Sequence, residues 1–447
     1  MSHDLRRAAS ATARVAALAR GVFMRSVAVA ALALVGALPL QAQEKAQEKT
    51  QDAAAAPIKV AFIDQLSGPL ANVGQIFQAN LKFALDDANA QGGVLGRNYA
   101  LVSYDNKLSA QESLIALQSA IDAGVHVVFT GASGSPVVTA LVEAVNRHNE
   151  RNPGQRVLIM NYASLDPDLT GTRCSFWHFA TEANTAMKMR ALANFAREQK
   201  GMHKVYLLNQ DYTQGRIWAA LGRQMIAGAR PDVQFVGEAL HPLARVKDFA
   251  PYMSRIKESG ADTVVTGNWG QELGLLIKAG GEAGYELNYL NHSGGGAPGT
   301  VLAVSQAKNA HLTWVAEYLP NGDDPVLAAL AARVRQTPAG EYFAPRVLIA
   351  VQMLSAAMRH ANSDDPTRIA FALEGMQYRS PVGDVLMRKS DHQLLLPQVV
   401  STIAPVDGKT VKVGVEGTQY GFRLDSTTAG ADLNLPSVCR MKRPAGT

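Results

Sequence analysis

The stretch that decides the fold runs from residue 126 to residue 149, HVVFTGASGSPVVTALVEAVNRHN. A β-branched apolar run at 127–129 meets a loop of Gly, Ala and Ser at 131–135, and a segment of helical periodicity follows. This order predicts a strand, a tight loop and a helix. A Gly- and Ser-rich loop before a helix presents backbone N–H groups and hydroxyls, which suit an anion such as a carboxylate. The alternative is that Ser133 or Ser135 only caps the helix.

The same unit recurs along the chain in two consecutive series. In the first series, strands are expected at residues 58–66, 99–104, 127–129 and 156–162. After residue 181 the alternation restarts, with strands expected at 204–209, 233–240, 262–267 and 285–291. Two βαβ series predict an α/β protein with two Rossmann-like, doubly wound parallel sheets. Because ligands bind at the carboxyl ends of such strands, the loops of both series predict a cleft between two lobes.

The first 42 residues have the composition of an export signal. Five arginines precede an apolar run of 14 residues at 27–40, which ends near the small residues Ala37 and Ala42. The run is too short to span a bilayer comfortably, and Met24 is an alternative start. No cysteine precedes Cys174, so we expect a soluble protein without a lipid anchor. Residues 43–57 are polar and then alanine-rich, which predicts a disordered tether.

The charge of the chain resides mainly in this leader. The formal net charge is +5, and residues 1–42 hold five Arg and one Asp, so the remainder carries +5 − 5 + 1 = +1. A nearly neutral chain without a basic cluster interleaved with aromatic residues does not favour nucleic-acid binding. About 390 residues remain for the ordered part, which is enough for two domains of usual size.

The chain contains two cysteines, Cys174 and Cys439. They suit an oxidising compartment if they pair, and two buried free thiols are the alternative. We predict that they pair, because a cysteine in the terminal segment of an exported chain fits a staple near the hinge. No paired histidine spacing accompanies them, so no metal or other cofactor is expected. The nucleophile elbow, H-E-x-x-H and phosphate-loop motifs are missing from the sequence, so we expect a binding protein rather than an enzyme.

Several segments, in this order, resemble the Leu/Ile/Val-binding branch of the type I periplasmic substrate-binding proteins. They are IKVAFIDQLSGPLANVGQ, GGVLGR, the strand with GASGS, ASLDPDLTG, NQDYTQG, GNWGQELGLLIKAG and SPVGDVLMRKSDHQLLLPQVV. The resemblance covers residues 58–440 and implies two lobes joined by a three-crossing hinge. It places lobe I at 58–181 and 317–388, lobe II at 182–316 and 389–440, and a C-terminal tail at 441–447.

The resemblance also implies a periplasmic protein that delivers a small solute to the membrane permease of an ABC transporter. We expect it to act as a monomer. A ligand-sensing ectodomain or receptor partner of the same fold, without transport, is the alternative function.

In this family, loops of the first lobe bind the ligand α-carboxylate and loops of the second lobe close over it. Gln214 stands where the family has a tyrosine, and Trp269 has a core position as its alternative. The ligand-binding residues predicted here are Ser67, Ser133, Ser135, Ala163, Ser164, Tyr212, Gln214, Trp269, Asn291 and Ser293.

Two departures from the family pattern bear on the ligand. Leu165 replaces a hydroxyl residue, and no Asp or Glu lies between Glu286 and Glu317, where amino-acid binders place the acid that pairs with the ammonium group. A buried ammonium group without a carboxylate partner is costly. The sequence therefore favours a carboxylate ligand with an apolar or aromatic body over leucine, isoleucine or valine, unless Glu272 or Asp211 supplies the missing charge.

Overall fold

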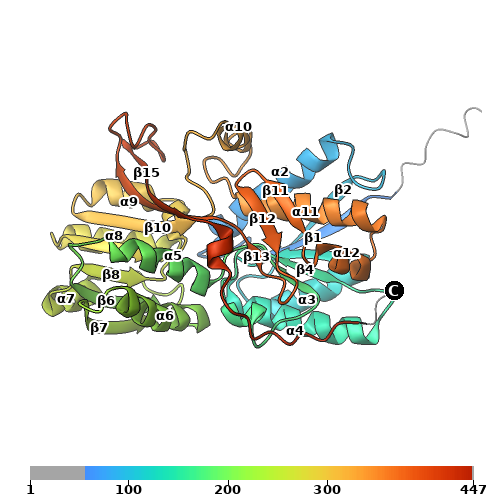
Figure 1. Cartoon of the computed structure of the whole chain (residues 1–447), viewed down its shortest axis with the longest axis horizontal. Coiled ribbons are helices and arrows are strands. Elements are labelled where there is room, and N and C mark those ends of the chain that lie inside the picture. Colours follow the sequence, from blue (N-terminus) through green and yellow to red (C-terminus); the bar gives the residue numbers. More distant parts are fainter. Residues whose placement is uncertain (1–55, 445–447) are drawn as a thin grey trace, which may run out of the picture. The chain divides into compact units, whose positions relative to one another are not determined.

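The computed structural model describes residues 56–444, which belong to one compact unit (Figure 1). The predicted signal peptide, nearly all of the predicted tether and residues 445–447 lie outside the described residues. Two mainly parallel sheets with helices on both faces organise the unit, which confirms the predicted doubly wound α/β fold.

The first sheet has the strand order β2-β1-β3-β4-β5, and all its neighbours are parallel. Its strands are β1 (Ile58–Asp64), β2 (Tyr99–Asp105), β3 (Val127–Thr130), β4 (Leu158–Asn161) and β5 (His178–Ala180). Its helices are α2 (Ala71–Ala90), α3 (Ala110–Asp122), α4 (Ser135–Arg151), α11 (Pro345–Ala361) and α12 (Pro366–Leu373). Every residue of β3 and β4 is buried, as expected for parallel strands that helices cover on both faces.

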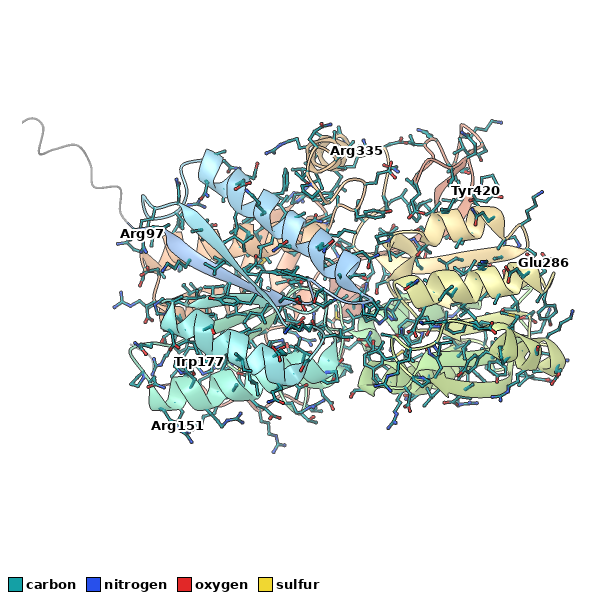
Figure 2. The ribbon with its side chains drawn as sticks, turned by 180° about the vertical axis from the view of Figure 1, so that it is seen from behind. Arg97, Arg151, Trp177, Glu286, Arg335 and Tyr420 are labelled. Carbon is teal, nitrogen blue, oxygen red and sulfur yellow. A yellow bond between two sulfur atoms is a disulfide. The ribbon has the colours of Figure 1, made fainter. Side chains whose placement is uncertain are left out.

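The second sheet has the order β15-β14-β10-β9-β8-β6-β7. Its parallel strands are β6 (Lys204–Gln210), β7 (Gln234–His241), β8 (Thr263–Thr266), β9 (Leu287–Asn291) and β10 (Ala310–Ala316). The strands β14 (Gln398–Pro405) and β15 (Tyr420–Thr428) are antiparallel additions, and β15 forms the edge of the sheet (Figure 2 labels Tyr420). Its helices are α5 (Thr185–Arg197), α6 (Thr213–Ala229), α7 (Ala250–Ser259), α8 (Gln271–Glu282) and α9 (Thr300–Gln306).

Side chains of each strand in this second sheet alternate between two separate cores. Tyr206 and Leu208 of β6 pack with α7, α8 and α9, whereas Leu207 between them packs with α5 and α6. The sheet is therefore buried on both faces, and only its strand ends and connecting loops are left for function.

A smaller antiparallel sheet and the C-terminal segment complete the first lobe. The sheet contains β11 (Gln377–Ser380), β12 (Gly383–Met387) and β13 (Leu394–Leu395), and α10 (Pro325–Val334) lies in the segment before it. After β15 and the short helix η4 (Gly430–Leu433), the chain returns to the first core, to which Leu433 and Met441 contribute. The chain therefore crosses between the lobes once more, in addition to the three predicted crossings.

The predicted disulfide between Cys174 and Cys439 is present, with the two Cα atoms 5.6 Å apart. Both cysteines pack against the core of the first lobe. The staple thus fixes the C-terminal segment onto the first lobe rather than at the hinge. Residues 389–396 and 430–440, assigned to lobe II from the sequence, include Leu394, Leu395, Leu396 and Leu433 of the first core.

Candidate functional site

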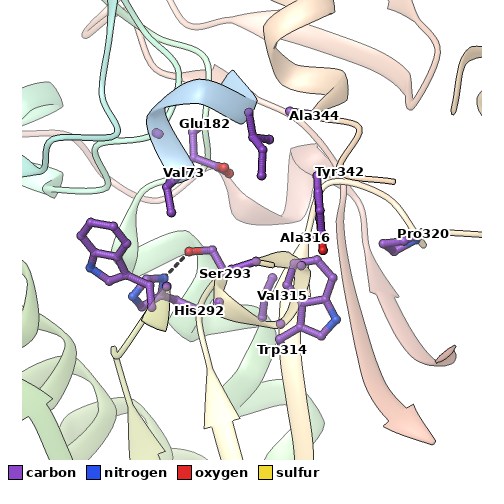
Figure 3. Close-up of a pocket in the computed structure, with 18 of the residues that line it drawn as sticks. Val73, Glu182, His292, Ser293, Trp314, Val315, Ala316, Pro320, Tyr342 and Ala344 are labelled. Carbon is purple, nitrogen blue, oxygen red and sulfur yellow. Dashed lines mark hydrogen bonds between the residues drawn. The ribbon is translucent and has the colours of Figure 1, made fainter. Parts of the chain in front are cut away.

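A cavity lies where the carboxyl ends of the two sheets face each other (Figure 3). From the first lobe it is lined by Val73, Ile76, Phe77, Gly131, Ala132, Gly134, Ala163 and Leu165. From the second lobe it is lined by Tyr212, Gln214, Trp269, Gly270 and residues 292–298. Its empty space is about 1290 Å³, including the part that is open to solvent. This upper limit is large enough for a small organic ligand.

The loop after β3 does present a nest of backbone N–H groups, but the protein itself fills it. The Asp64 carboxylate accepts the N–H groups of Gly131 at 2.9 Å, Ala132 at 3.2 Å and Ser133 at 2.7 Å. The hydroxyl of Tyr162 donates a further hydrogen bond to the same carboxylate. In this structure Asp64 therefore occupies these three N–H groups, and ligand binding by the rest of the predicted loop stays a prediction.

The serines of this loop neither cap the helix nor line the cavity. The Ser133 hydroxyl lies 2.6 Å from Gln65 Oε1 and accepts from Asn106 Nδ2 at 2.8 Å. The residue at the N-cap of α4 is Gly134, and no side chain caps that helix end. Ser135 is buried outside the cavity lining, and its hydroxyl has no partner among the described residues. Ser133 is thus bound in an internal polar network, whereas a ligand contact for Ser135 stays a prediction.

In the loop after β4, too, a side chain of the protein accepts the backbone N–H groups. The side chain of Asn161 accepts the backbone N–H groups of Ala163 at 3.3 Å and Ser164 at 2.8 Å. Ala163 and Leu165 line the cavity, whereas Ser164 does not. A Cβ atom on Gly131 would lie 2.6 Å from the nitrogen of Ala163, so only glycine allows the two loops to approach this closely.

The second-lobe aromatic residues lie where the sequence predicts them. Trp269 and Tyr212 both line the cavity, and Trp269 Nε1 donates to the Tyr212 hydroxyl at 3.2 Å. Burial raises the pKa of Tyr212, so the phenol stays protonated. Gln214 lines the same wall. Trp269 is thus a wall residue of the cavity rather than a core residue, and its contact with a ligand stays a prediction.

Besides Ser133, Ser135 and Ser164, two further predicted residues do not line the cavity, namely Ser67 and Asn291. Ser67 is exposed. Asn291 shapes its own loop, because its amide donates to the carbonyls of Thr266 and Asn268, both at 2.8 Å, while its oxygen accepts from the N–H of Ser293 at 3.0 Å. Ser293 itself lines the cavity.

The two acids proposed to replace the missing charge do not reach the cavity. Glu272 is buried behind the wall, where it accepts from Gln210 Nε2 at 2.7 Å and from the backbone of Arg245 at 3.2 Å. Asp211 is exposed and pairs with Arg216 at 2.7 Å. The structure therefore removes both as partners of a ligand ammonium group.

Sequence reasoning missed a buried ionic cluster at the hinge. Arg346 at the start of α11 bonds Glu182 and Glu317, each at 2.8 Å, and Lys188 of α5 lies 3.2 Å from Glu182. All four side chains line the cavity (Figure 3 labels Glu182). Burial raises the pKa of Glu317, but the charges of Arg346 and Lys188 lower it overall. The available signal was the placement of charged residues inside apolar stretches, such as Glu317 directly after β10.

This cluster offers hydrogen-bond donors to a ligand. The ammonium group of Lys188 has three N–H bonds, and its contacts at Glu182 and at the carbonyl of Val315, both 3.2 Å, account for two of them. Among residues 56–444 no protein group takes the third. With two acids and two bases, the cluster is formally neutral before a ligand binds.

Comparison with known proteins settles the family. Residues 57–408 match the family model described as periplasmic binding protein. The chain belongs to this family. A relative named "Leu/Ile/Val-binding protein homolog 4" from Brucella abortus (strain 2308) is 29% identical over 435 residues, which are 95% of this chain and 99% of the relative. The resemblance to the branched-chain amino acid branch is thereby confirmed.

Solved structures share the fold of this binding protein. A leucine-, isoleucine-, valine-, threonine- and alanine-binding protein from Brucella ovis, in a closed conformation, has a TM-score of 0.75 and 28% identity, covering 87% of this chain and all (100%) of its own. A solute binding protein from Rhodopseudomonas palustris BisB5, in complex with 3,4-dihydroxybenzoic acid, has a TM-score of 0.69 and 17% identity, covering 84% and 98%. The second likeness shows the fold alone.

Aromatic rings form much of the cavity wall of this binding protein. Trp314 at the end of β10 lies against the loop of Gly294–Gly296, where a Cβ atom on Gly295 would meet the ring at 2.3 Å. Tyr342 faces the same end of the cavity (Figure 3) and donates to Glu416 at 3.2 Å. The glycines of this loop are thus required by the bulk of Trp314.

Over residues 56–444, no helix combines the length and the apolar character needed to cross a membrane. Within that same range, no group of three or more His, Cys, Asp or Glu side chains is placed to hold a metal ion.

Proposed function

We propose that this protein is an exported, periplasmic component of an ABC transporter that captures a small carboxylate-bearing ligand between its lobes and delivers it to the membrane permease. The observation that carries the proposal is a single cavity wall built from both lobes, with Ala163 on one side and Tyr212 and Trp269 on the other. A ligand that contacts both sides favours the closed arrangement by differential contact.

The ligand carboxylate is assigned to the hinge side of the cavity. The backbone N–H nest of the first lobe holds Asp64, so it has no capacity for a second anion. Lys188 retains an N–H donor, and Arg346 carries a second positive charge in the same wall. Both cations are buried, so their hydrogen bonds to a carboxylate are charge-assisted and strong.

The body of the ligand is assigned to the aromatic walls. Flat rings at Tyr212, Trp269 and Trp314 suit an aromatic or branched apolar group. Gln214 and Ser293 are the polar residues of the second lobe that line the same space. From the predicted set we assign Ala163, Tyr212, Gln214, Trp269 and Ser293 to ligand contact, and we leave out those that do not line the cavity.

A free amino acid fits this wall less well than an organic acid. At the hinge the cavity is lined by Glu182 and Glu317, and both already pair with Arg346 or Lys188. The other two acids of the lining, Glu341 and Glu416, accept backbone N–H groups at 2.7 and 2.9 Å. An ammonium group would therefore share its acid with a neighbouring cation, which weakens the pairing. We favour an organic acid with an apolar or aromatic body, although the relatives are named for branched amino acids.

The test is mass spectrometry of the ligand released from protein purified without denaturation. We expect a small carboxylate at about one molecule per chain. A thermal-shift panel of aliphatic amino acids, keto acids and aromatic carboxylates complements it, because ligand at 100 times its Kd stabilises by about 2.7 kcal/mol. If branched amino acids raise the Tm and their des-amino analogues do not, the preference for an organic acid is wrong.

The proposal includes binding without turnover. The ligand recovered after prolonged incubation with the protein should be chemically unchanged, as measured by mass spectrometry. Conversion of the bound compound to a product would contradict the assignment as a transport component.

A further inference from the structure

Ser293 lies beside His292 in the loop that follows β9, and both residues line the cavity (Figure 3). His292 is buried, with 2% of its surface exposed. Its Nε2 atom lies 2.9 Å from the carbonyl oxygen of Gly267, and its Nδ1 atom lies 2.5 Å from Ser293 Oγ. These two contacts determine where the protons are.

A carbonyl oxygen can only accept a hydrogen bond, so Nε2 of His292 carries the ring proton. Burial, and after it the charge of Lys188, lower the pKa of His292 to about 3, although the hydrogen bond to Gly267 raises it. The ring is therefore neutral, and a neutral imidazole has one N–H group. Nδ1 is then bare, and the hydroxyl of Ser293 must donate to it.

We infer that Ser293 offers a ligand only hydrogen-bond acceptance, because its single proton is held by His292, and that this part of the cavity selects a neutral donor, namely the hydroxyl group of a hydroxy acid. The inference rests on the proposed function, in which the cavity binds an organic acid. Ser293 is thereby a specificity-determining residue.

The neighbourhood of Ser293 distinguishes a neutral donor from a charged one. Lys188 lines the same cavity as Ser293, so this space already contains a positive charge. An ammonium group at Ser293 would meet a hydroxyl oxygen rather than a carboxylate, because the Ser293 hydroxyl bonds His292 and the acids of the hinge cluster already pair with Arg346 and Lys188. A ketone or a second carboxylate would place an oxygen against the lone pairs of Ser293, which leaves both acceptors without a proton.

The loop holds Ser293 in this position. Asn291 accepts the N–H groups of Ser293 at 3.0 Å and Gly294 at 2.5 Å, so the backbone on both sides of the hydroxyl is fixed. Asn291 was predicted to contact the ligand. In the structure it holds the backbone of Ser293, which lines the cavity.

The first experiment is calorimetric titration with four acids that share one carbon skeleton: 2-hydroxy-4-methylpentanoate, 4-methyl-2-oxopentanoate, 4-methylpentanoate and leucine. The pair 4-hydroxybenzoate and benzoate repeats the comparison on an aromatic body. We expect a hydroxylated acid to bind about tenfold more tightly than its counterpart without the hydroxyl, the factor that corresponds to one good hydrogen bond. The Ser293→Ala variant should reduce this ratio to about one.

The control is Ser254→Ala, which removes an exposed serine hydroxyl of the second lobe whose partner is the carbonyl of Ala250. This variant should keep the wild-type ratio. Equal binding of the hydroxylated acids and their counterparts, tighter binding of leucine or the keto acid, or a ratio unchanged in Ser293→Ala would overturn the inference while leaving the proposed function intact. Failure of all the probes to bind would overturn both.

A second experiment needs no ligand. Nitrogen NMR of histidine-labelled protein, with His292→Gln for assignment, should show a neutral ring with the proton on Nε2 between about pH 5 and 8. Ser293→Ala should shift the Nδ1 signal because the hydrogen bond to it is lost. A proton on Nδ1, or protonation of the ring within this range, would overturn the inference whether or not the probes bind.

Discussion

The Asp64 carboxylate accepts the backbone N–H of Ser133 at 2.7 Å and thereby fills the nest at the end of β3. Burial raises the pKa of Asp64 to about 6, although hydrogen bonds from Tyr162 and Ser133 lower it. The side chain of Asp64 thus occupies the N–H groups that the sequence predicted to bind a ligand carboxylate. It also makes the stability of the first lobe depend on pH.

The Asp64→Asn variant should change that dependence. Below about pH 4 the carboxyl is protonated in both states; as the pH rises to about 6, the unfolded state loses its proton first, so the free energy of unfolding falls. Relative to Asp64→Asn, the free energy of unfolding of the wild type should fall by on the order of 3 kcal/mol between about pH 4 and pH 6. Above about pH 6 the difference between the two proteins should stay constant. Urea unfolding across this pH range measures it, with exposed Asp86→Asn as control. Parallel curves for wild type and Asp64→Asn would contradict the prediction.

Arg346→Met should destabilise the protein strongly, because Glu182 and Glu317 lose their common partner in a buried site. We expect a loss of about 3–5 kcal/mol in the free energy of unfolding. The double variant Glu317→Gln/Arg346→Met should recover part of it, since one of the two stranded charges is removed. Denaturant unfolding of the four proteins gives the coupling.

The control for this cycle is Arg379→Met, which breaks the ion pair between Arg379 and Asp384. The side chain of Arg379 is 80% exposed and that of Asp384 is 77% exposed. An exposed pair contributes less than about 1 kcal/mol. Equal effects of Arg346→Met and Arg379→Met would show that the hinge cluster has no special role.

Gly295→Ala should distort the cavity wall. The added Cβ would lie 2.3 Å from the Trp314 ring, and relief of such overpacking costs about 1–3 kcal/mol. Gly228→Ala in α6 is the matched control, because nothing lies within 4 Å of its added Cβ. That change should be neutral or stabilise by up to about 1 kcal/mol, as alanine favours helix. Thermal unfolding of both variants tests the contrast, and a stable Gly295→Ala protein would refute it.

Cys439→Ser should release the C-terminal segment from the first lobe and lower the free energy of unfolding by about 2–4 kcal/mol. Reduction of the wild type should bring it to the level of the variant. Val438→Ala, at a neighbouring position that is 65% exposed, should leave stability unchanged. Thiol titration of denatured, unreduced wild-type protein should find no free thiol, and two thiols per chain would overturn the pairing.

Ligand binding should close the lobes. Gly134 of the first lobe lies beside Tyr212 of the second, where a Cβ atom would be 3.6 Å from its ring, so the cleft edges meet in this structure. We expect the free protein to populate a more open arrangement than this one, so saturation with the tightest ligand of the panel should reduce the radius of gyration and change tryptophan fluorescence. Trp269→Phe and Trp314→Phe, at the two cavity-wall positions, should each reduce the fluorescence change, whereas Trp177→Phe in the first core should not. An unchanged radius of gyration by X-ray scattering counts against closure.

The two sheets were predictable because their signals are local. The alternation of short β-branched runs with helical periodicity, as at 127–149, depends only on neighbours in sequence. The disulfide between Cys174 and Cys439 was also predictable, since the chain has only this pair. Which lobe the disulfide joins to the C-terminal segment was not predictable, because this depends on the path of the chain after β15.

The sequence by itself determined the fold class, the family and the loops that form the cavity, because each is written in residues close together along the chain. The tertiary structure alone decided which groups in those loops are available to a ligand. Asp64 and Ser133 are 69 residues apart, and Arg346 lies 29 residues from Glu317, so neither contact leaves a local pattern. Hydrogen-bond donors and charges in a buried site are satisfied by whatever the fold brings to them, and only the assembled structure shows what is left over.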